Sequence, residues 1–269
     1  MARRLVLRFV PALFAAVAFS GCVGDFALNG RATDIWTRTY QLSPGGEVRI
    51  GNTNGRVEVE GVDGNTVDIR AERIAKATTD DAAQELLPRI KIEEDAKPDR
   101  IDVHTARMSG IMVGASIEVR YHVRAPKNAK ISVSNTNGVV TLTALAGTTE
   151  AHTTNGGVRG TEMRGEVEAE TTNGGVTIDF AAIDRDVKLS TTNGGVTIGL
   201  PESAKASIVA TCTNGGISVT GVKMEISEES RRRVEGKMNG GGANVLLHTT
   251  NGGVRIRARG EGAKKSETS

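Results

Sequence analysis

The sequence has few aromatic residues, with one Trp, two Tyr and five Phe among 269 residues. Phe9, Phe14 and Phe19 lie within the first 21 residues, so only five rings remain in the rest of the chain. Proteins that bind single-stranded nucleic acid stack the bases on aromatic side chains. This scarcity therefore argues against nucleic acid as a partner.

The chain also has only two cysteines, Cys22 and Cys212. Since Cys22 is the expected lipid attachment site, as argued below, Cys212 is left without a partner for an intramolecular disulfide. Its place in the repeat described below, in a position otherwise held by small polar residues, predicts a buried apolar thiol.

Catalytic signatures are missing beyond the first 21 residues, where no HExxH, GxSxG, P-loop or Rossmann glycine pattern occurs. The chain has four histidines, His104, His122, His152 and His248. His104 and His122 fall in neighbouring predicted strands, where they would face each other, but neither has a cysteine or a placed carboxylate as a further zinc ligand. We expect no metal site, no cofactor and no enzyme activity.

Several carboxylates near the middle of the repeat are the residues to weigh for glycoside chemistry. They are Glu166, Glu168, Glu170, Asp179, Asp184 and Asp186. Hydrolysis of a glycoside needs a pair at a defined separation, with the pKa of one member raised. These acids lie among Arg164, Arg185 and Lys188, so a mixed-charge, solvated face is the simpler interpretation.

The amino-terminal segment predicts export. Arg3, Arg4 and Arg8 precede a short apolar stretch that ends in Phe19-Ser20-Gly21-Cys22, which resembles the lipobox of bacterial lipoprotein signal peptides. The resemblance implies cleavage before Cys22 and attachment of diacylglycerol and a further acyl chain, such as palmitate, at that residue. The alternative is an ordinary signal peptide that is cut nearby. Without residues 1–21 the formal charge falls from +2 to −1, so the basic pI is largely an export feature.

The dominant feature is a Thr-Asn-Gly repeat. From the second copy onward the asparagines are 18, 18, 20, 21 and 37 residues apart. The last interval is close to two periods, so MNGGGANV (residues 238–245) is either a degenerate copy or an insertion. The paired residues are Thr53 and Asn54, Thr136 and Asn137, Thr154 and Asn155, Thr172 and Asn173, Thr192 and Asn193, Thr213 and Asn214, and Thr250 and Asn251.

Two architectures fit this repeat. Asn-Gly is a strong signal for hairpin turns, which would give an antiparallel meander or sandwich. The alternative is a β-solenoid, in which each turn stacks on the equivalent turn of the next coil. A hairpin does not require the same Thr in every copy, whereas a stack places identical side chains about 4.8 Å apart as Thr and Asn ladders. We therefore predict an all-β, β-solenoid-like stack of about six coils, and a structural role for the ladder residues.

The remaining segments complete a predicted domain plan. A strand is expected at 66–74, a short helix at 79–88, and further strands near 89–93, 100–106 and 116–124, forming a helix-bearing insertion near 66–125. A second helix is expected at 227–236. The plan is a signal peptide at 1–21, a linker at 22–44, the repeat domain at 45–258 and a disordered tail at 259–269.

Residues 66–106, the segment YHVRAPKNAKISVSNTNGVVTL (residues 121–142) and the tandem TTNGGV copies together resemble the bacterial "putative adhesin" family of domains of unknown function. The resemblance covers roughly residues 45–258 and implies a β-solenoid-like surface domain, often attached to the envelope, without established enzymatic activity. Some members of that family are linked to envelope-stress signalling.

The sequence thus predicts a non-enzymatic scaffold or adhesion domain of the cell envelope, lipid-anchored on the periplasmic or surface face. Its expected partners are the membrane and either an envelope protein or a surface polysaccharide. The alternatives are a carbohydrate-active β-helix enzyme and an envelope-stress signalling regulator.

Overall fold

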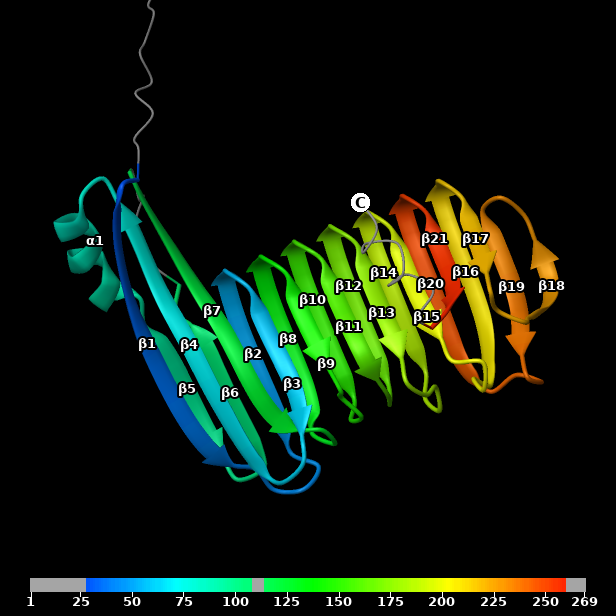
Figure 1. Ribbon diagram of the computed structural model, residues 1–269, viewed down its shortest axis with the longest axis horizontal. Coiled ribbons are helices and arrows are strands. Elements are labelled where there is room, and N and C mark those ends of the chain that lie inside the picture. The colour runs from blue at the N-terminus through cyan, green and yellow to red at the C-terminus, as the bar shows by residue number, and fades with distance from the viewer. Residues whose placement is uncertain (1–27, 108–113, 260–269) are drawn as a thin grey trace, which may run out of the picture.

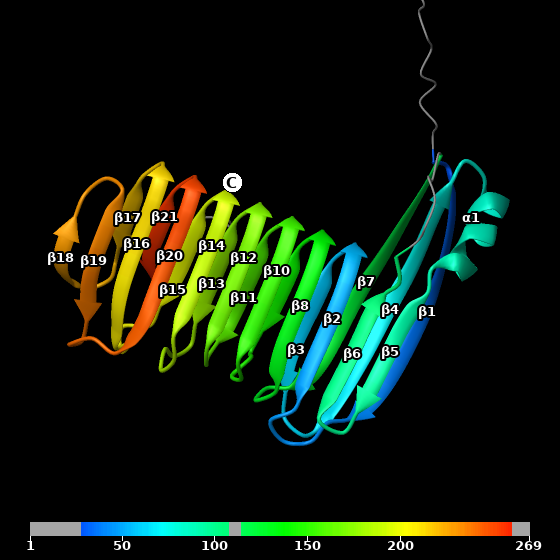
Figure 2. The ribbon, with the colours of Figure 1, turned by 180° about the vertical axis from the view of Figure 1, so that it is seen from behind.

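The computed structural model describes residues 28–107 and 114–259. The expected signal peptide, Cys22 and the expected tail from residue 260 onward lie outside the described residues. Two long sheets run side by side along the molecule and form the two walls of an elongated rod (Figures 1 and 2).

One wall, here called sheet A, has ten strands. In spatial order they are β1 (Gly30–Gln41), β4 (Thr66–Ala77), β7 (Ala115–Pro126), β3 (Val57–Val62), β9 (Val140–Thr143), β11 (Val158–Met163), β13 (Val176–Phe180), β15 (Val196–Leu200), β21 (Val254–Ala258) and β17 (Ile217–Thr220).

The other wall, sheet B, has eleven strands. In spatial order they are β18 (Glu225–Glu229), β19 (Arg233–Met238), β16 (Ala206–Asn214), β20 (Ala243–Asn251), β14 (Val187–Asn193), β12 (Val167–Asn173), β10 (Thr149–Asn155), β8 (Lys130–Asn137), β2 (Glu47–Asn54), β6 (Arg100–Thr105) and β5 (Ile92–Lys97).

Each Thr-Asn-Gly turn joins a strand of sheet B to a strand of sheet A, and equivalent strands of successive coils pair in parallel. In the pairing of β10 with β12, for example, Ala151 lies opposite Ala169 and Asn155 lies opposite Asn173. Repeated residues therefore stack on their own counterparts, which confirms the predicted solenoid. The hairpin alternative is wrong, because the two strands that flank a turn lie in different sheets.

The order of coils along the rod differs from their order in the chain near its carboxyl-terminal end. The coil of β20 and β21 is the last in the sequence, yet it lies between the coils of β14/β15 and β16/β17. The chain passes β16 and β17, reverses through β18 and β19, and returns to fill that gap (Figure 2). The 37-residue interval of the repeat is therefore an insertion, in which Asn239 lies in the β19–β20 turn.

The same arrangement occurs at the other end of the rod. The coil of β2 and β3 comes first in the sequence, but it lies between the coils of β6/β7 and β8/β9. The stack therefore has eight two-strand coils in place of the six expected, and at about 4.8 Å per coil it is about 38 Å long. The first coil and the last coil of the chain thus each lie between two coils that follow each other directly in the sequence.

The core is a thin double column of aliphatic side chains between the sheets. One column consists of fully buried valines, each of which stacks on its counterpart in the next coil: Val57, Val140, Val158, Val176 and Val196. Because every coil buries only a few such residues, stability depends mainly on the contact between neighbouring coils.

The amino-terminal end is closed by β1, β4 and a short helix. Helix α1 (Asp80–Leu86) packs on β1 and β4, and the Thr79 hydroxyl caps it by accepting a hydrogen bond from the Ala82 amide. A 3-10 turn follows at Leu87–Arg89. The helix expected at 79–88 is thus present. The linker predicted at 22–44 is wrong for residues 30–41, which form β1 along its whole length against β4.

The carboxyl-terminal end is closed on the sheet B side by the β18–β19 hairpin. The helix predicted at 227–236 is wrong, because this segment lies in the antiparallel strands β18 and β19, and β19 alternates between buried and outward residues. Val234 and Met238 are buried, whereas Arg233 faces outward and binds the carboxylates of Glu228 and Glu235. Oppositely charged residues at these spacings can form ion pairs in a hairpin as well as in a helix, so the charge pattern does not distinguish the two structures.

A partly buried ion pair ties the inserted last coil to the interior of the stack. The Arg257 guanidinium on β21 donates two hydrogen bonds, 2.7 and 2.8 Å long, to the Asp179 carboxylate on β13. Between them lies Gly199 on β15, where a Cβ atom would come within 1.8 Å of the Asp179 carboxylate. Glycine at this position lets the pair bridge an intervening strand.

Candidate functional site

The Thr-Asn-Gly turns lie one above another and form a continuous edge of the rod, here called the ridge (residues 53–56, 136–139, 154–157, 172–175, 192–195, 213–216 and 250–253). In every coil of the ridge but the last, the backbone amide of the glycine directly after the asparagine donates to the asparagine carbonyl of the next coil, as Gly174 does to Asn193 at 2.9 Å. The ridge therefore adds a line of backbone hydrogen bonds between coils to the parallel strand pairing of the two sheets.

The asparagine side chains form an unbroken hydrogen-bonded column along the ridge. Each Nδ2 donates to the Oδ1 of the preceding coil at 2.7–2.9 Å. The column follows spatial order and runs Asn54, Asn137, Asn155, Asn173, Asn193, Asn251, Asn214.

The threonines have a different role from the one expected. Within the described residues, no side-chain hydrogen bond involves the threonine that directly precedes each asparagine, so no such ladder forms. The hydroxyl that stacks belongs to the residue two before the asparagine. Thr153, Thr171, Thr191 and Thr249 are buried and donate to the ridge-glycine carbonyl of the neighbouring coil at 2.7–3.2 Å. Their inward parity was visible in the sequence, but their bonding partner was not.

Cys212 occupies the equivalent inward position in the last coil of the stack. It is buried, at 5% exposure, and unpaired. Its Sγ atom lies 3.8 Å from the Arg231 carbonyl. The thiol thus fills the slot of a small threonine, as expected.

Asparagines replace threonine at this inward position in the two copies nearest the amino-terminal end. Asn52 donates to the carbonyl of Val119 and accepts from Thr105, whose hydroxyl also bonds the Tyr121 phenol. Burial raises the pKa of Tyr121 to about 12, although the Thr105 hydrogen bond acts in the opposite direction. This buried network joins β2, β6 and β7, where the ridge ends.

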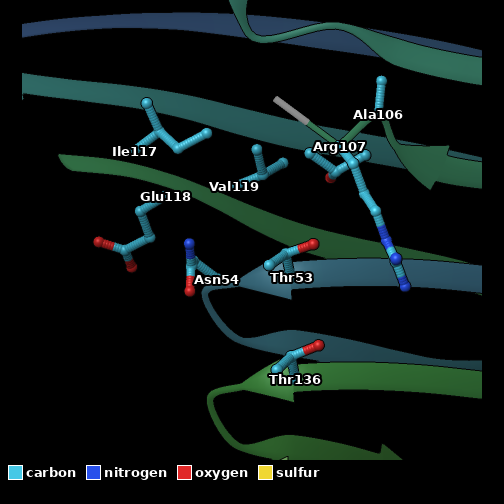
Figure 3. Close-up of a pocket in the computed structure, with 9 residues that line it drawn as sticks. Thr53, Asn54, Ala106, Arg107, Ile117, Glu118, Val119 and Thr136 are labelled. Carbon is cyan, nitrogen blue, oxygen red and sulfur yellow. The ribbon is translucent and has the colours of Figure 1, made fainter. Parts of the chain in front are cut away.

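A notch opens at that end of the ridge, because the coil of β6 and β7 lacks a Thr-Asn-Gly turn. The cavity has a volume of about 410 Å³. Figure 3 shows Thr53 and Asn54 from β2 and Thr136 from β8 beside Ile117, Glu118 and Val119 from β7. Its lining offers hydroxyls, one amide, Arg107 and Glu118 over an apolar floor, a mixture suited to binding and lacking an activated nucleophile.

The candidate catalytic carboxylates are dispersed, since Glu166, Asp184 and Asp186 lie in the connections between strands and the other three are divided between the two sheets. Glu168 and Glu170 lie on sheet B, whereas Asp179 lies on sheet A. Glu168 binds Lys188 at 2.7 Å, and Glu170 lies 3.6 Å from the His152 ring. The hydrogen bond from Lys188 lowers the pKa of Glu168, which is opposite to what a general acid requires.

The histidines are also separated. His104 is on β6 in sheet B and His122 is on β7 in sheet A, so the expected facing pair is wrong. In a solenoid, strands that are consecutive in the sequence lie in opposite sheets and do not face each other as neighbours. His152 and His248 do point outward from sheet B, in the same row of residues.

No group of three or more His, Cys, Asp or Glu within residues 28–107 and 114–259 is arranged to hold a metal ion. Over the same residues, no helix is long and apolar enough to cross a bilayer.

Acidic pH is expected to weaken the stack. Lys188 lowers the pKa of Glu168, and hydrogen bonds from the Asn244 backbone and side chain lower that of Asp186 on the inserted coil's boundary. A carboxyl whose pKa is lower in the folded state stabilises the fold above its unfolded value of about 4, and this contribution is lost as pH falls through the folded value. Urea unfolding should give a constant free energy from pH 6 to 7 and a decline below about pH 4. A midpoint unchanged at pH 3 would contradict this.

The family model of Toastrack DUF4097 matches residues 102–257. Among solved structures, a "putative cell adhesion protein" from Clostridium sporogenes is 12% identical, with a TM-score of 0.43 over 84% of this chain and 100% of that chain. A "putative adhesin" from Bacteroides fragilis is 12% identical, with a TM-score of 0.40 over 83% of this chain and 97% of that one. No curated protein matches the chain.

The matched segment begins in β6 and ends in β21, so it includes every coil from β8/β9 onward. It covers more than half of the chain and confirms the family resemblance read from the TTNGGV copies. The chain belongs to the Toastrack DUF4097 family.

Proposed function

We propose that this protein is a non-catalytic binding domain of the cell envelope, tethered by a lipid at Cys22, which contacts an envelope component through the outer faces of its solenoid. The observation that carries the proposal is that the repeated side chains and the variable side chains have different roles. The residues that repeat, Asn173 and Thr171 for example, bond to the neighbouring coil, whereas the outward residues of the strands differ from coil to coil.

The chemistry of the faces supports binding over catalysis. Outward carboxylates on sheet B are paired with basic groups, as in Glu168 with Lys188 and Glu150 with Lys130.

Tethering is tested by comparing the two cysteines in the full chain, expressed in a bacterial host. Wild type and Cys212→Ala should partition into the detergent phase with the envelope fraction and carry a lipid mass at the new amino terminus. Cys22→Ala should be exported without lipid and enter the aqueous phase. Cys212→Ala is the matched control, because it removes the other thiol and leaves the anchor. A Cys22→Ala chain that still partitions with detergent would refute the tether.

Binding is tested by photo-crosslinking in intact envelopes. A photoreactive residue at Ser190 reports on the sheet B face, one at Thr177 reports on the sheet A face, and one at the buried Ile178 is the control. We expect a discrete crosslinked product from at least one face and none from Ile178. Recovery of the uncrosslinked monomer from both faces would contradict the proposal.

A further inference from the structure

Sheet B carries a groove that exists only because the last coil is inserted. It has a volume of about 540 Å³ and is lined by residues of β12, β14, β20 and β16. These four strands are adjacent in Figure 2. Small-molecule sites have volumes of about 300–1,000 Å³, so the groove is large enough for a ligand of that size.

The floor of the groove is apolar, whereas the outward residues at the same register position in the other coils of sheet B are charged or polar. Leu246 is 48% exposed, and it lies between Lys188 on β14 and Val209 on β16 in the parallel register. In the preceding coils the same position holds Glu168 and Glu150. Leu246 is the only large apolar side chain exposed on a coil strand within the described residues.

Beside this floor lies a row of hydroxyl and imidazole groups that can form hydrogen bonds. Ser190, His248 and Thr211 stand opposite one another on β14, β20 and β16. The Nδ1 atom of His248 lies 2.9 Å from the Thr211 hydroxyl, and its Nε2 atom has no protein partner within the described residues. Thr192 and Thr250 add two further hydroxyls at the ridge side.

The charges at the rim disfavour an anionic ligand. Lys188 is engaged by Glu168 at 2.7 Å, and Glu170 adds a second, exposed carboxylate at the rim. Because the cation is already paired and a carboxylate remains exposed, the groove favours a neutral occupant over an anionic polymer.

We propose that this groove, floored by Leu246 and Val209 and lined by Ser190, His248 and Thr211, binds a neutral glycan. A sugar ring has a C–H face that packs on aliphatic side chains, and hydroxyls at its rim that exchange hydrogen bonds with hydroxyl and imidazole groups. The inference rests on the proposed function, since it names a ligand class and a place for that binding activity.

The experiment uses the detergent-solubilised full chain in native gels that contain a neutral glucan, a neutral mannan or the anionic polymer alginate. Wild type should be retarded by a neutral polymer and not by alginate. Leu246→Glu should weaken the retardation at least tenfold, and His248→Ala several-fold. Ser132→Glu is the control, because it places the same charge in the same row at a distant coil and should behave as wild type.

Glutamate is tolerated by the fold at this row, since Glu150 and Glu168 already occupy it, so loss of binding by Leu246→Glu would not reflect unfolding. Retardation of Leu246→Glu equal to that of wild type would overturn the assignment, as would a crosslink from Ser190 to a sugar-free protein. Crosslinking through Thr177 with no retardation by any neutral polymer would overturn the groove and leave the proposed function standing.

Discussion

Gly174→Ala is expected to lower the free energy of unfolding by about 3 kcal/mol, whereas Gly175→Ala, one residue later, should change it by less than about 1 kcal/mol. Gly174 has a φ of +155°, and a Cβ atom there would lie 2.1 Å from the Gly156 carbonyl oxygen of the neighbouring coil. Both the backbone conformation and the space exclude a side chain.

Gly175 provides the matched control. A Cβ atom at this position would lie 3.3 Å from the Gly195 carbonyl oxygen, and the equivalent positions of two other copies hold Arg56 and Val139. Urea unfolding of the full chain, followed by circular dichroism, measures both variants. Equal losses for the two would show that close stacking of the coils is not what requires glycine at the ridge.

Thr171→Val should cost about 2 kcal/mol, and Thr172→Val less than about 0.5 kcal/mol. Thr171 is buried, and its hydroxyl donates to the Gly156 carbonyl at 2.7 Å. Valine has nearly the same shape, so the change removes the hydroxyl and leaves that carbonyl without its side-chain donor. Thr172 is exposed and makes no side-chain hydrogen bond.

The same urea measurement separates the two threonines. If Thr172→Val lowered the free energy of unfolding more than Thr171→Val, the threonines directly before the asparagines would be the ones that stabilise the stack, as the repeat alone suggests. An additional check is available at Thr191, which makes the equivalent bond to Gly174 at 2.8 Å and should give a similar loss on replacement by valine.

Sequence alone was sufficient for the solenoid and for the asparagine column, because both follow from a turn that recurs with identical residues. It was insufficient for the order of the coils. The parallel register aligns Asn251 equally well with any other ridge asparagine, and its place between Asn193 and Asn214 is fixed by contacts such as Asp179 with Arg257, which no local pattern reveals.

The candidate groove was not foreseeable for the same reason. Leu246 and Ser190 are 56 positions apart, and only the inserted coil brings them together. The threonines directly before the asparagines are identical in every copy, yet the hydroxyls that bond between coils lie one position earlier. The repeated Thr-Asn-Gly sequence therefore locates the ridge, and the inward direction of a side chain determines which threonine forms the hydrogen bond between coils.

The reversed placement of the first and last coils has a consequence for how such proteins change in length. In an ordinary array of repeats each unit contacts only its neighbours, so removing a unit from an end leaves the contacts among the others unchanged. Here both the first and the last coil lie between two coils that follow each other in the chain, so deleting the last coil would leave a gap in the interior of the rod and detach β16 and β17 from their support. The coils from β8/β9 to β14/β15 follow one another simply, with spacings of 18, 18 and 20 residues. Duplication of one of these middle units would lengthen the rod and preserve the arrangement at both ends.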